Sequence, residues 1–224
     1  MSEMYLMCGM SGSGKTTYAK QFAKEHDLVY LGIDDMYAEI NGDECIHENT
    51  FQAWILFYEK IHSLAVGGIS CIVDTNALTF CHRTQFLDWF PEFDKHHLIY
   101  IRASEELFIV NNNNRKRVIP IDRIREMEDM FMPPTLGEQE DPRWVSIVEI
   151  ENYANNFQPP IYIKEQGVVL PKEEGEPLKS ICDECFWENI CTGGTDDKQT
   201  CPQYKPKYQN PPIEEFLDLN DLVE

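Results

Sequence analysis

The segment from Gly9 to Thr16 constrains this chain more than any other, because its residue spacing dictates the backbone around it. It reads Gly-Met-Ser-Gly-Ser-Gly-Lys-Thr and matches the pattern G-x-x-x-x-G-K-[ST]. Glycines let the chain bend so that successive amide groups point inward, and a helix that starts there adds partial positive charge. Such a turn suits a polyphosphate, provided that it follows a strand and opens a helix.

The flanking residues fit this requirement. Residues 4–8 form a short apolar run that predicts a buried strand, and a helix is expected from Lys15 to about Glu25. In this arrangement Lys15 reaches the β- and γ-phosphates of a nucleoside triphosphate, and the Thr16 hydroxyl holds Mg²⁺. We therefore predict that ATP and Mg²⁺ bind at the residues of this loop, namely Gly9, Ser11, Gly12, Ser13, Gly14, Lys15, Thr16 and Thr17.

Strands and helices alternate along the rest of the first 160 residues. Apolar runs predict four further strands, at residues 28–33, 70–74, 97–101 and 144–150. Helical spacing predicts helices between and after them, at residues 51–65, 79–90, 104–112 and 121–131. This alternation predicts an α/β fold of the P-loop NTPase type, a three-layer sandwich with a parallel sheet covered on both faces.

Acidic residues follow two of these strands. Asp34 and Asp35 come after the second strand, and Asp74, Thr75 and Asn76 follow the third. Because ligands of such sheets bind beyond the carboxyl ends of the strands, one crevice can hold all of these side chains together with the glycine loop. A carboxylate there can accept the proton of an attacking hydroxyl, and we favour Asp34 for this role.

Two of these acidic positions have other interpretations. Adjacent acids after a strand, such as Asp34 and Asp35, can also cap the helix that follows. Asp74 lies where an acid can hold Mg²⁺ through water, while capping by Asp74 or Asn76 is the structural alternative. The sequence leaves these alternatives open.

Charge is distributed unevenly along the chain. The net charge of −20 opposes unspecific binding to nucleic acid. Residues 110–125 are an exception, with one acid against five basic side chains: Arg115, Lys116, Arg117, Arg123 and Arg125. A basic cluster on an acidic protein usually contacts an anion, and a solvated helix face is the alternative.

Four sequence stretches together resemble a known family. They are GMSGSGKTTYAKQF, IDDMY, VDTN and NNNNRKRVIPIDRIREM. Over residues 3–135 the chain resembles the P-loop kinases of the polynucleotide 5′-kinase and zeta-toxin type, with their AAA-type ATP-binding domain. The resemblance implies an ATP-dependent phosphotransferase that moves the γ-phosphate to a hydroxyl, most directly the 5′-hydroxyl of a nucleic acid.

The resemblance also implies roles for individual residues. The expected catalytic residues are Lys15, Asp34, Arg115 and Arg117. The acceptor side comprises Asp35, Asp74, Asn76 and Arg83.

The chain departs from the family pattern at three places. Ile33 stands where the pattern has an arginine before the two acids. Val110 and Asn114 stand at two arginine positions of the family's lid, whose contacts Arg115 or Arg117 could replace after a small loop shift.

The third departure is on the acceptor side. Tyr37 stands where the pattern has an arginine that grips the acceptor's phosphate, and Arg83 is the replacement that could reach in. Two other functions therefore stay open. One is a kinase of a small hydroxyl compound, such as a nucleoside or sugar nucleotide, and the other is a nucleotide-switched binding module without transfer.

The regular alternation stops near residue 160, which predicts two domains: residues 1–160, a P-loop kinase domain, and residues 161–224, a cysteine-rich extension. Four cysteines gather in the extension: Cys182, Cys185, Cys191 and Cys201. In a cytosolic chain this spacing suggests a small metal-stapled unit rather than disulfides, with zinc or a 4Fe–4S cluster as the candidate metals. The acidic end, IEEFLDLNDLVE, is either a helix for a protein partner or a disordered tail.

The remaining expectations concern location and aromatic residues. No stretch approaches the roughly 20 apolar residues of a membrane helix, and no basic segment precedes an apolar one at the N-terminus. We therefore predict a cytoplasmic protein without a membrane partner. Three aromatic residues at helical spacing, Phe51, Trp54 and Tyr58, are interpreted as core rather than as a platform for base stacking.

Overall fold

The computed structural model describes residues 1–116 and 118–165. The strands are β1 (Glu3–Cys8), β2 (Val29–Gly32), β3 (Cys71–Asp74), β4 (Lys95–Ala103), β5 (Trp144–Tyr153), β6 (Asn156–Phe157) and β7 (Ile161–Glu165). The helices are α1 (Lys15–His26), α2 (Ile33–Asn41), α3 (Thr50–Val66), α4 (Phe80–Trp89), α5 (Glu105–Asn113), α6 (Ile121–Met130) and α7 (Leu136–Glu140). The predicted alternation is confirmed from β1 to β5, while α2, α7, β6 and β7 were not anticipated.

The described strands form one sheet in the order β2-β3-β1-β4-β5, and β5 also pairs with β6 and β7. The first five strands are parallel to their neighbours, whereas β6 and β7 are antiparallel to β5. The sheet is therefore mostly parallel, not wholly parallel as the sequence predicts. Because the five parallel strands share a direction, their carboxyl ends meet at a single edge.

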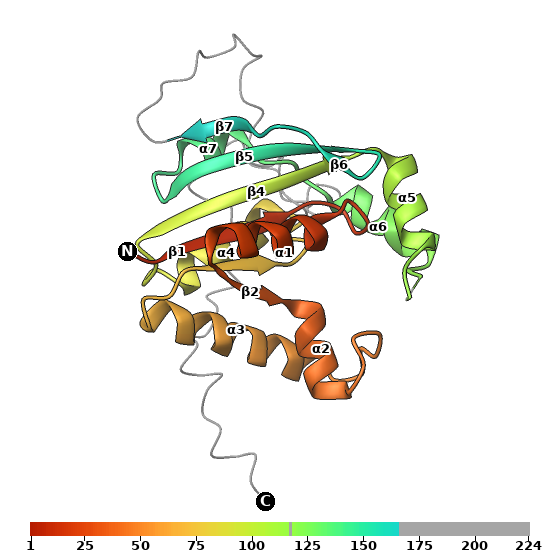
Figure 1. The fold of residues 1–224 in the computed structure, drawn as a ribbon, viewed down its shortest axis with the longest axis horizontal. Coiled ribbons are helices and arrows are strands. Elements are labelled where there is room, and N and C mark those ends of the chain that lie inside the picture. The colour runs from red at the N-terminus through yellow and green to blue at the C-terminus, as the bar shows by residue number, and fades with distance from the viewer. Residues whose placement is uncertain (117, 166–224) are drawn as a thin grey trace, which may run out of the picture. The chain divides into compact units, whose positions relative to one another are not determined.

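Helices cover both faces of the sheet, because the order in which the chain adds strands changes direction once. From β1 it crosses to β2, and from there it returns through β3, β4 and β5. Right-handed crossovers then put α1 on one face and the later helices on the other. Figure 1 shows α1 in front of the strands and α4 behind them. On the α1 face Ala19 and Ala23 pack against Met7 and Ile72.

The sheet extends beyond the predicted domain boundary at residue 160. Residues 161–165, which the sequence analysis assigned to the extension, form β7 and pair with β5 from Ser146–Glu165 to Glu149–Ile161. The physical reason is that β5 would otherwise present an unpaired edge over this length. Among the described helices, none has the length and apolar content needed to cross a membrane.

Candidate functional site

The loop between β1 and α1 requires glycine at three of its positions, Gly9, Gly12 and Gly14, and Gly9 has a φ of 141°. Gly12 and Gly14 have φ angles of 85° and 96°, in the left-handed region that side chains disfavour. A Cβ atom on Gly12 would lie 2.5 Å from the carbonyl oxygen of Phe108, and one on Gly14 would lie 2.6 Å from Asn152 Nδ2. The pattern of glycines thus reflects both backbone conformation and close neighbours.

Asparagine side chains from distant parts of the chain hold this loop in place. Asn152 Nδ2 donates to the carbonyl oxygen of Ser13 (2.7 Å), and Asn111 Nδ2 donates to that of Gly12 (2.8 Å). Asn76 Nδ2 donates to Ser11 Oγ (3.2 Å). From the sequence, Asn111 belongs to a run of four asparagines that more simply marks a helix end than a phosphate site, and Asn152 has no assigned role. Nothing in the local sequence connects these residues with a loop 99 and 139 residues earlier.

Lys15 lies at the start of α1 and is buried, with 6% of its surface exposed. Its Nζ donates to the carbonyl oxygen of Met10 (2.7 Å) across the loop. Burial lowers the pKa of Lys15 to about 8, while the nearby carboxylates of Asp74 and Asp34 act in the opposite direction. The ammonium group is therefore held in a pocket where an anionic ligand would stabilise its charge.

A cavity of about 1170 Å³ adjoins this loop at the carboxyl edge of the sheet. It brings together most of the residues predicted for the site: Ser11, Gly12, Gly14, Lys15, Thr16, Thr17, Asp34, Asp35, Asp74, Asn76 and Arg115. Gly9 and Ser13 do not line it. Both are buried within the loop, and a Cβ atom on Gly9 would lie 2.6 Å from the carbonyl oxygen of Ile101.

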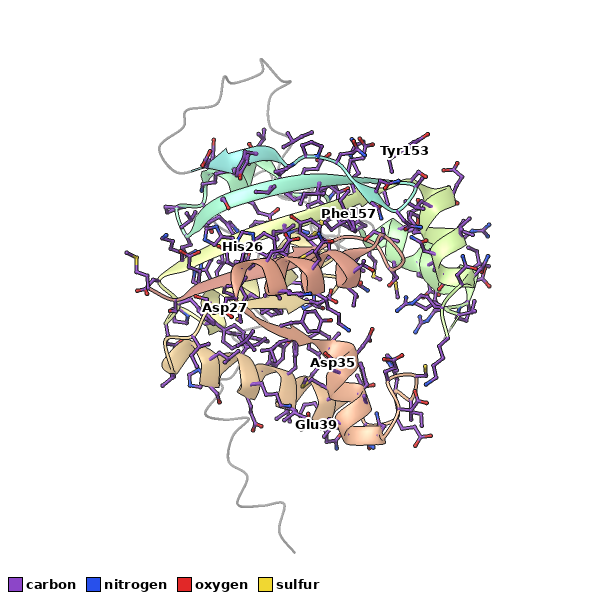
Figure 2. All side chains as sticks on the ribbon, viewed as in Figure 1. His26, Asp27, Asp35, Glu39, Tyr153 and Phe157 are labelled. Atoms are coloured by element: carbon purple, nitrogen blue, oxygen red, sulfur yellow. The ribbon has the colours of Figure 1, made fainter. Side chains whose placement is uncertain are left out.

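Asp34 and Asp35 lie in the first turn of α2, directly after β2. Neither is the N-cap, because Gly32 occupies that position, but carboxylates in a first turn interact favourably with the helix dipole. Figure 2 labels Asp35 at this end of α2, with Glu39 one turn further along. The Asp34 carboxylate is half exposed, and its Oδ2 lies 3.8 Å from Arg115 Nη2.

Asp74 ends β3 and is buried, and its carboxylate accepts a hydrogen bond from the Tyr30 hydroxyl (2.9 Å). With Thr16 it offers a carboxylate and a hydroxyl oxygen beside Lys15, and both side chains line the cavity. These hard oxygen donors fit Mg²⁺ shared with phosphate oxygens. Within residues 1–116 and 118–165, no cluster of three or more His, Cys, Asp or Glu side chains could hold a metal by itself.

The segment between α5 and α6 is connected with the opposite side of the cavity by two ion pairs. Arg115 faces Asp34, and Lys116 Nζ lies 3.1 Å from Asp43 Oδ2 in the segment after α2. Arg117, the other predicted catalytic arginine, lies outside the described residues, as do Cys182, Cys185, Cys191 and Cys201.

Arg83 does not reach the acceptor side as expected. Its side chain is fully buried, and its Nε and Nη2 donate to Glu138 Oε1 and Oε2 (2.6 and 2.7 Å). Its Nη1 donates to the carbonyl oxygens of Ala77 (3.0 Å) and Met132 (2.9 Å). The expectation is corrected because the buried guanidinium is already satisfied by Glu138, which the sequence analysis did not consider.

Besides Tyr30, four aromatic or imidazole side chains line the cavity: Tyr37, His47, Trp54 and His82. Sequence reasoning missed this group. The interpretation of Trp54 as core is incomplete, because its half-buried side chain also forms part of the cavity wall. Phe51, on the same helix, is 60% exposed and does not belong to the core. Helical spacing alone could not distinguish these environments.

Comparisons with solved structures show what the fold resembles. A sugar kinase from Janibacter sp. HTCC2649 has 18% identity and a TM-score of 0.51, covering 67% of this chain and 86% of the kinase chain. A structure from the PezAT toxin–antitoxin system of Streptococcus pneumoniae has 14% identity and a TM-score of 0.54, covering 71% of each chain. A chain of the Pnkp1/Rnl/Hen1 RNA repair complex has 16% identity and a TM-score of 0.51, covering 63% of this chain and 50% of that one.

These identities support a shared fold. No curated protein matches the sequence. A family model does match, and its description is AAA domain (AAA_33). The matched segment, residues 4–134, contains the glycine loop, Asp34, Asp74 and Arg115, and it spans more than half of the chain. The protein therefore belongs to the AAA_33 family of AAA domains.

Proposed function

We propose that this protein is an ATP-dependent phosphotransferase that moves the γ-phosphate to a hydroxyl group. The observation that carries the proposal is that Lys15 and Asp34 line the same cavity, the one in the glycine loop and the other in the facing turn of α2. A triphosphate held by the loop would point its last phosphate toward a carboxylate. That carboxylate can accept the proton of an incoming alcohol.

In the proposed reaction the acceptor loses the proton of its O–H bond to the Asp34 carboxylate. Its oxygen forms a bond with the γ-phosphorus, the bond from that phosphorus to the β–γ bridging oxygen breaks, and ADP leaves. Lys15 and Arg115, together with Arg117, would stabilise negative charge on the transferred group. Arg115 suits this role because it lines the same cavity as Lys15 and its guanidinium lies 3.8 Å from the Asp34 carboxylate.

Thr16 and Asp74 would hold Mg²⁺, which when bound neutralises charge on the phosphates. Asp35 and Asn76 would lie on the acceptor side. Asn76 has a second task, since its amide holds Ser11 while its backbone carbonyl accepts from the amide of Gly9 (3.0 Å). It therefore connects the acceptor side with the loop that binds the donor.

The acceptor is either the 5′-hydroxyl of a nucleic acid, as the resemblance implies, or a small hydroxyl compound. A nucleic acid strand carries phosphates that need unpaired cations. Three of the described cations that line the cavity have carboxylate partners, in the pairs Arg115–Asp34, Lys116–Asp43 and Arg123–Glu126, while Lys20 lies over the ring of Tyr30. Arg83 is buried with Glu138. These pairings favour a small hydroxyl compound.

A transfer assay tests this function. The protein is incubated with γ-labelled ATP, Mg²⁺ and a panel of nucleosides, sugars and 5′-hydroxyl oligonucleotides. We expect labelled phosphate on at least one alcohol, and none with the Lys15→Met variant, which lacks the ammonium that faces the phosphates. Tight ATP binding without transfer to any acceptor would instead indicate a nucleotide-switched binding module.

The affinity for ATP should fall as the pH rises. Because burial lowers the pKa of Lys15 to about 8, the free protein loses this charge above that pH, whereas a bound triphosphate would keep the ammonium protonated. Binding then takes up a proton, so the Kd should rise about tenfold between about pH 7 and about pH 9. Titration calorimetry or a fluorescent ATP analogue measures this change.

The Lys15→Met variant is the control, and its weaker binding should not change over the same range. A wild-type Kd that stays constant between the two pH values would contradict the assignment of Lys15 to the phosphates.

Three expectations for the C-terminal extension stay proposals. They are a domain division near residue 160, zinc or a 4Fe–4S cluster at the four cysteines, and a protein partner for the acidic end. Metal analysis of the purified full chain, with an absorbance spectrum near 400 nm, tests the cluster against zinc. The cytoplasmic location is likewise a proposal.

A further inference from the structure

We propose that the acceptor is an uncharged alcohol that carries a planar unsaturated ring, as a nucleoside does, and that this ring lies against Tyr37, His47, Trp54 and His82. These four residues are called the aromatic wall. The inference rests on the proposed phosphotransfer, and it adds the substrate class. Three properties of the cavity support it: the arrangement of the rings, the apolar residues that accompany them and the charges around them.

The aromatic wall is built from several elements and is supported from behind. Tyr37 of α2 is stacked on His47, with ring centroids 3.7 Å apart and planes inclined by 20°. Trp54 of α3 lies 5.9 Å from His82 of α4. Tyr58 and Phe57 pack against Trp54 at 5.4 and 5.6 Å. Neighbouring rings thus restrict the orientations of the wall before a ligand arrives.

Apolar side chains from other elements line the same cavity. Leu78 lies in the segment between β3 and α4, and Met127 and Met130 belong to α6. Leu78 and Met127 also pack against the small core of Met10, Phe108 and Ile124, which keeps them in place.

Aromatic faces, thioethers and aliphatic groups bind flat unsaturated rings well. They offer few partners for the many hydroxyls of a sugar, which would lose hydrogen bonds to water on entering. This part of the lining therefore favours an acceptor with a planar ring, while polar residues of the same cavity, such as Asp35, Thr75 and Thr79, can bind its hydroxyl groups.

The charges of this region favour an uncharged acceptor. Burial lowers the pKa of His82 to about 4, so that its ring is neutral near pH 7. Asp34, Asp35 and Glu44 line the cavity, and three of its described cations, Arg115, Lys116 and Arg123, are paired with carboxylates. A phosphate or carboxylate on the acceptor would therefore meet these negative groups, and it would have to compete with them for the three cations. A nucleoside without phosphate avoids this repulsion.

The positions of Asp34 and Tyr37 relate the ring to the reacting hydroxyl. They are three residues apart on α2, and residues at this spacing lie on the same side of a helix, about 5–6 Å apart at Cβ. An acceptor whose hydroxyl group is bound at Asp34 would therefore have its ring near Tyr37 if one small spacer separates the hydroxyl group from the ring. The sugar of a nucleoside is such a spacer between the 5′-hydroxyl and the base.

The test compares acceptors with the wild-type protein and γ-labelled ATP. The acceptors are uncharged nucleosides, D-ribose, the 3′-phosphates of the same nucleosides, and a 5′-hydroxyl oligonucleotide. We expect kcat/KM for at least one nucleoside to exceed that for ribose and for its own 3′-phosphate by tenfold or more, on the order of what one aromatic stack contributes.

Each of the other outcomes has a defined meaning. Equal or better use of ribose would overturn the role of the ring. Better use of the 3′-phosphate or the oligonucleotide would overturn the proposal of an uncharged acceptor. It would indicate instead that the acceptor is the 5′ end of a nucleic acid strand. Label on no acceptor, with ATP binding intact, would overturn the proposed function itself.

Variants of Trp54 test whether the aromatic wall causes the preference for a nucleoside. Trp54→Leu should raise the KM for the preferred nucleoside about tenfold while leaving the KM for ATP unchanged, and Trp54→Phe should retain most of the affinity. Tyr162→Leu is the matched control, since Tyr162 lies on β7 and does not line the cavity. An unchanged nucleoside KM in Trp54→Leu overturns the proposal. The acceptor comparison with the wild-type protein decides the question even if this variant does not fold.

Discussion

Replacing Asp34 by asparagine should lower kcat for phosphoryl transfer by a factor of about 10²–10⁴, the contribution typical of a general base. The amide keeps the size of the side chain but cannot take the proton of the acceptor. Because the loss falls on the transition state, kcat and kcat/KM should decrease together. Steady-state assays with saturating ATP and the preferred acceptor measure both quantities.

ATP binding provides the internal check on this variant, since the donor lies at the glycine loop. The Kd for ATP should change by no more than about threefold, within the range of a surface charge change. Glu39→Gln is the matched control, because Glu39 lies on the same helix, pairs with Lys60 and does not line the cavity. An Asp34→Asn protein that transfers phosphate at the wild-type rate would exclude Asp34 as the base.

Replacing Glu138 by glutamine should lower the free energy of unfolding by about 3–5 kcal/mol, because it leaves the charge of Arg83 buried without its carboxylate. Both side chains of this pair are almost completely buried, at 0% and 1% exposure. A domain of this size is stable by only about 5–15 kcal/mol, so the variant should unfold at a much lower urea concentration. Urea unfolding followed by circular dichroism measures the loss.

The same Glu39→Gln variant is the matched control for stability, since it removes a carboxylate from an exposed pair with Lys60. Exposed pairs contribute about 0–1 kcal/mol, so this control should change little. If the free energy of unfolding falls by the same small amount in both variants, the Arg83 guanidinium is satisfied without the Glu138 carboxylate. The buried pair is then not a major source of stability.

The Arg83–Glu138 pair also bears on the site. Arg83 donates to the carbonyl oxygens of Ala77 and Leu78, in the segment that follows Asp74 and Asn76. Ala77 has a φ of 43°, which a residue with a side chain adopts only when its surroundings hold it there. The Asn76 contacts to the glycine loop thus depend on a buried cation, so variants of Glu138 should weaken ATP binding as well.

Much of the fold and of the candidate site could be predicted from local sequence. The glycine loop follows from residue spacing, because only glycine tolerates the conformations at Gly12 and Gly14. The five parallel strands of the sheet follow from short apolar runs, and most of the longer helices follow from apolar residues at helical spacing. The carboxyl edge of a parallel sheet then places Asp34, Asp74 and Lys15 around one cavity. Each of these inferences needs only neighbours along the chain and a general rule about parallel strands.

Tertiary structure alone decided the rest, because the deciding partner is distant in sequence. Arg83 lies in the interior and not on the acceptor side, because the carboxylate of Glu138, 55 residues later, pairs with its guanidinium. Trp54 is part of the cavity wall as well as of the core, because it lines the cavity together with Tyr37 of α2 and His82 of α4. Asn111 and Asn152 fix the glycine loop across 99 and 139 residues. A sequence pattern records what a side chain can do, and its partners in space determine which of these possibilities it realises.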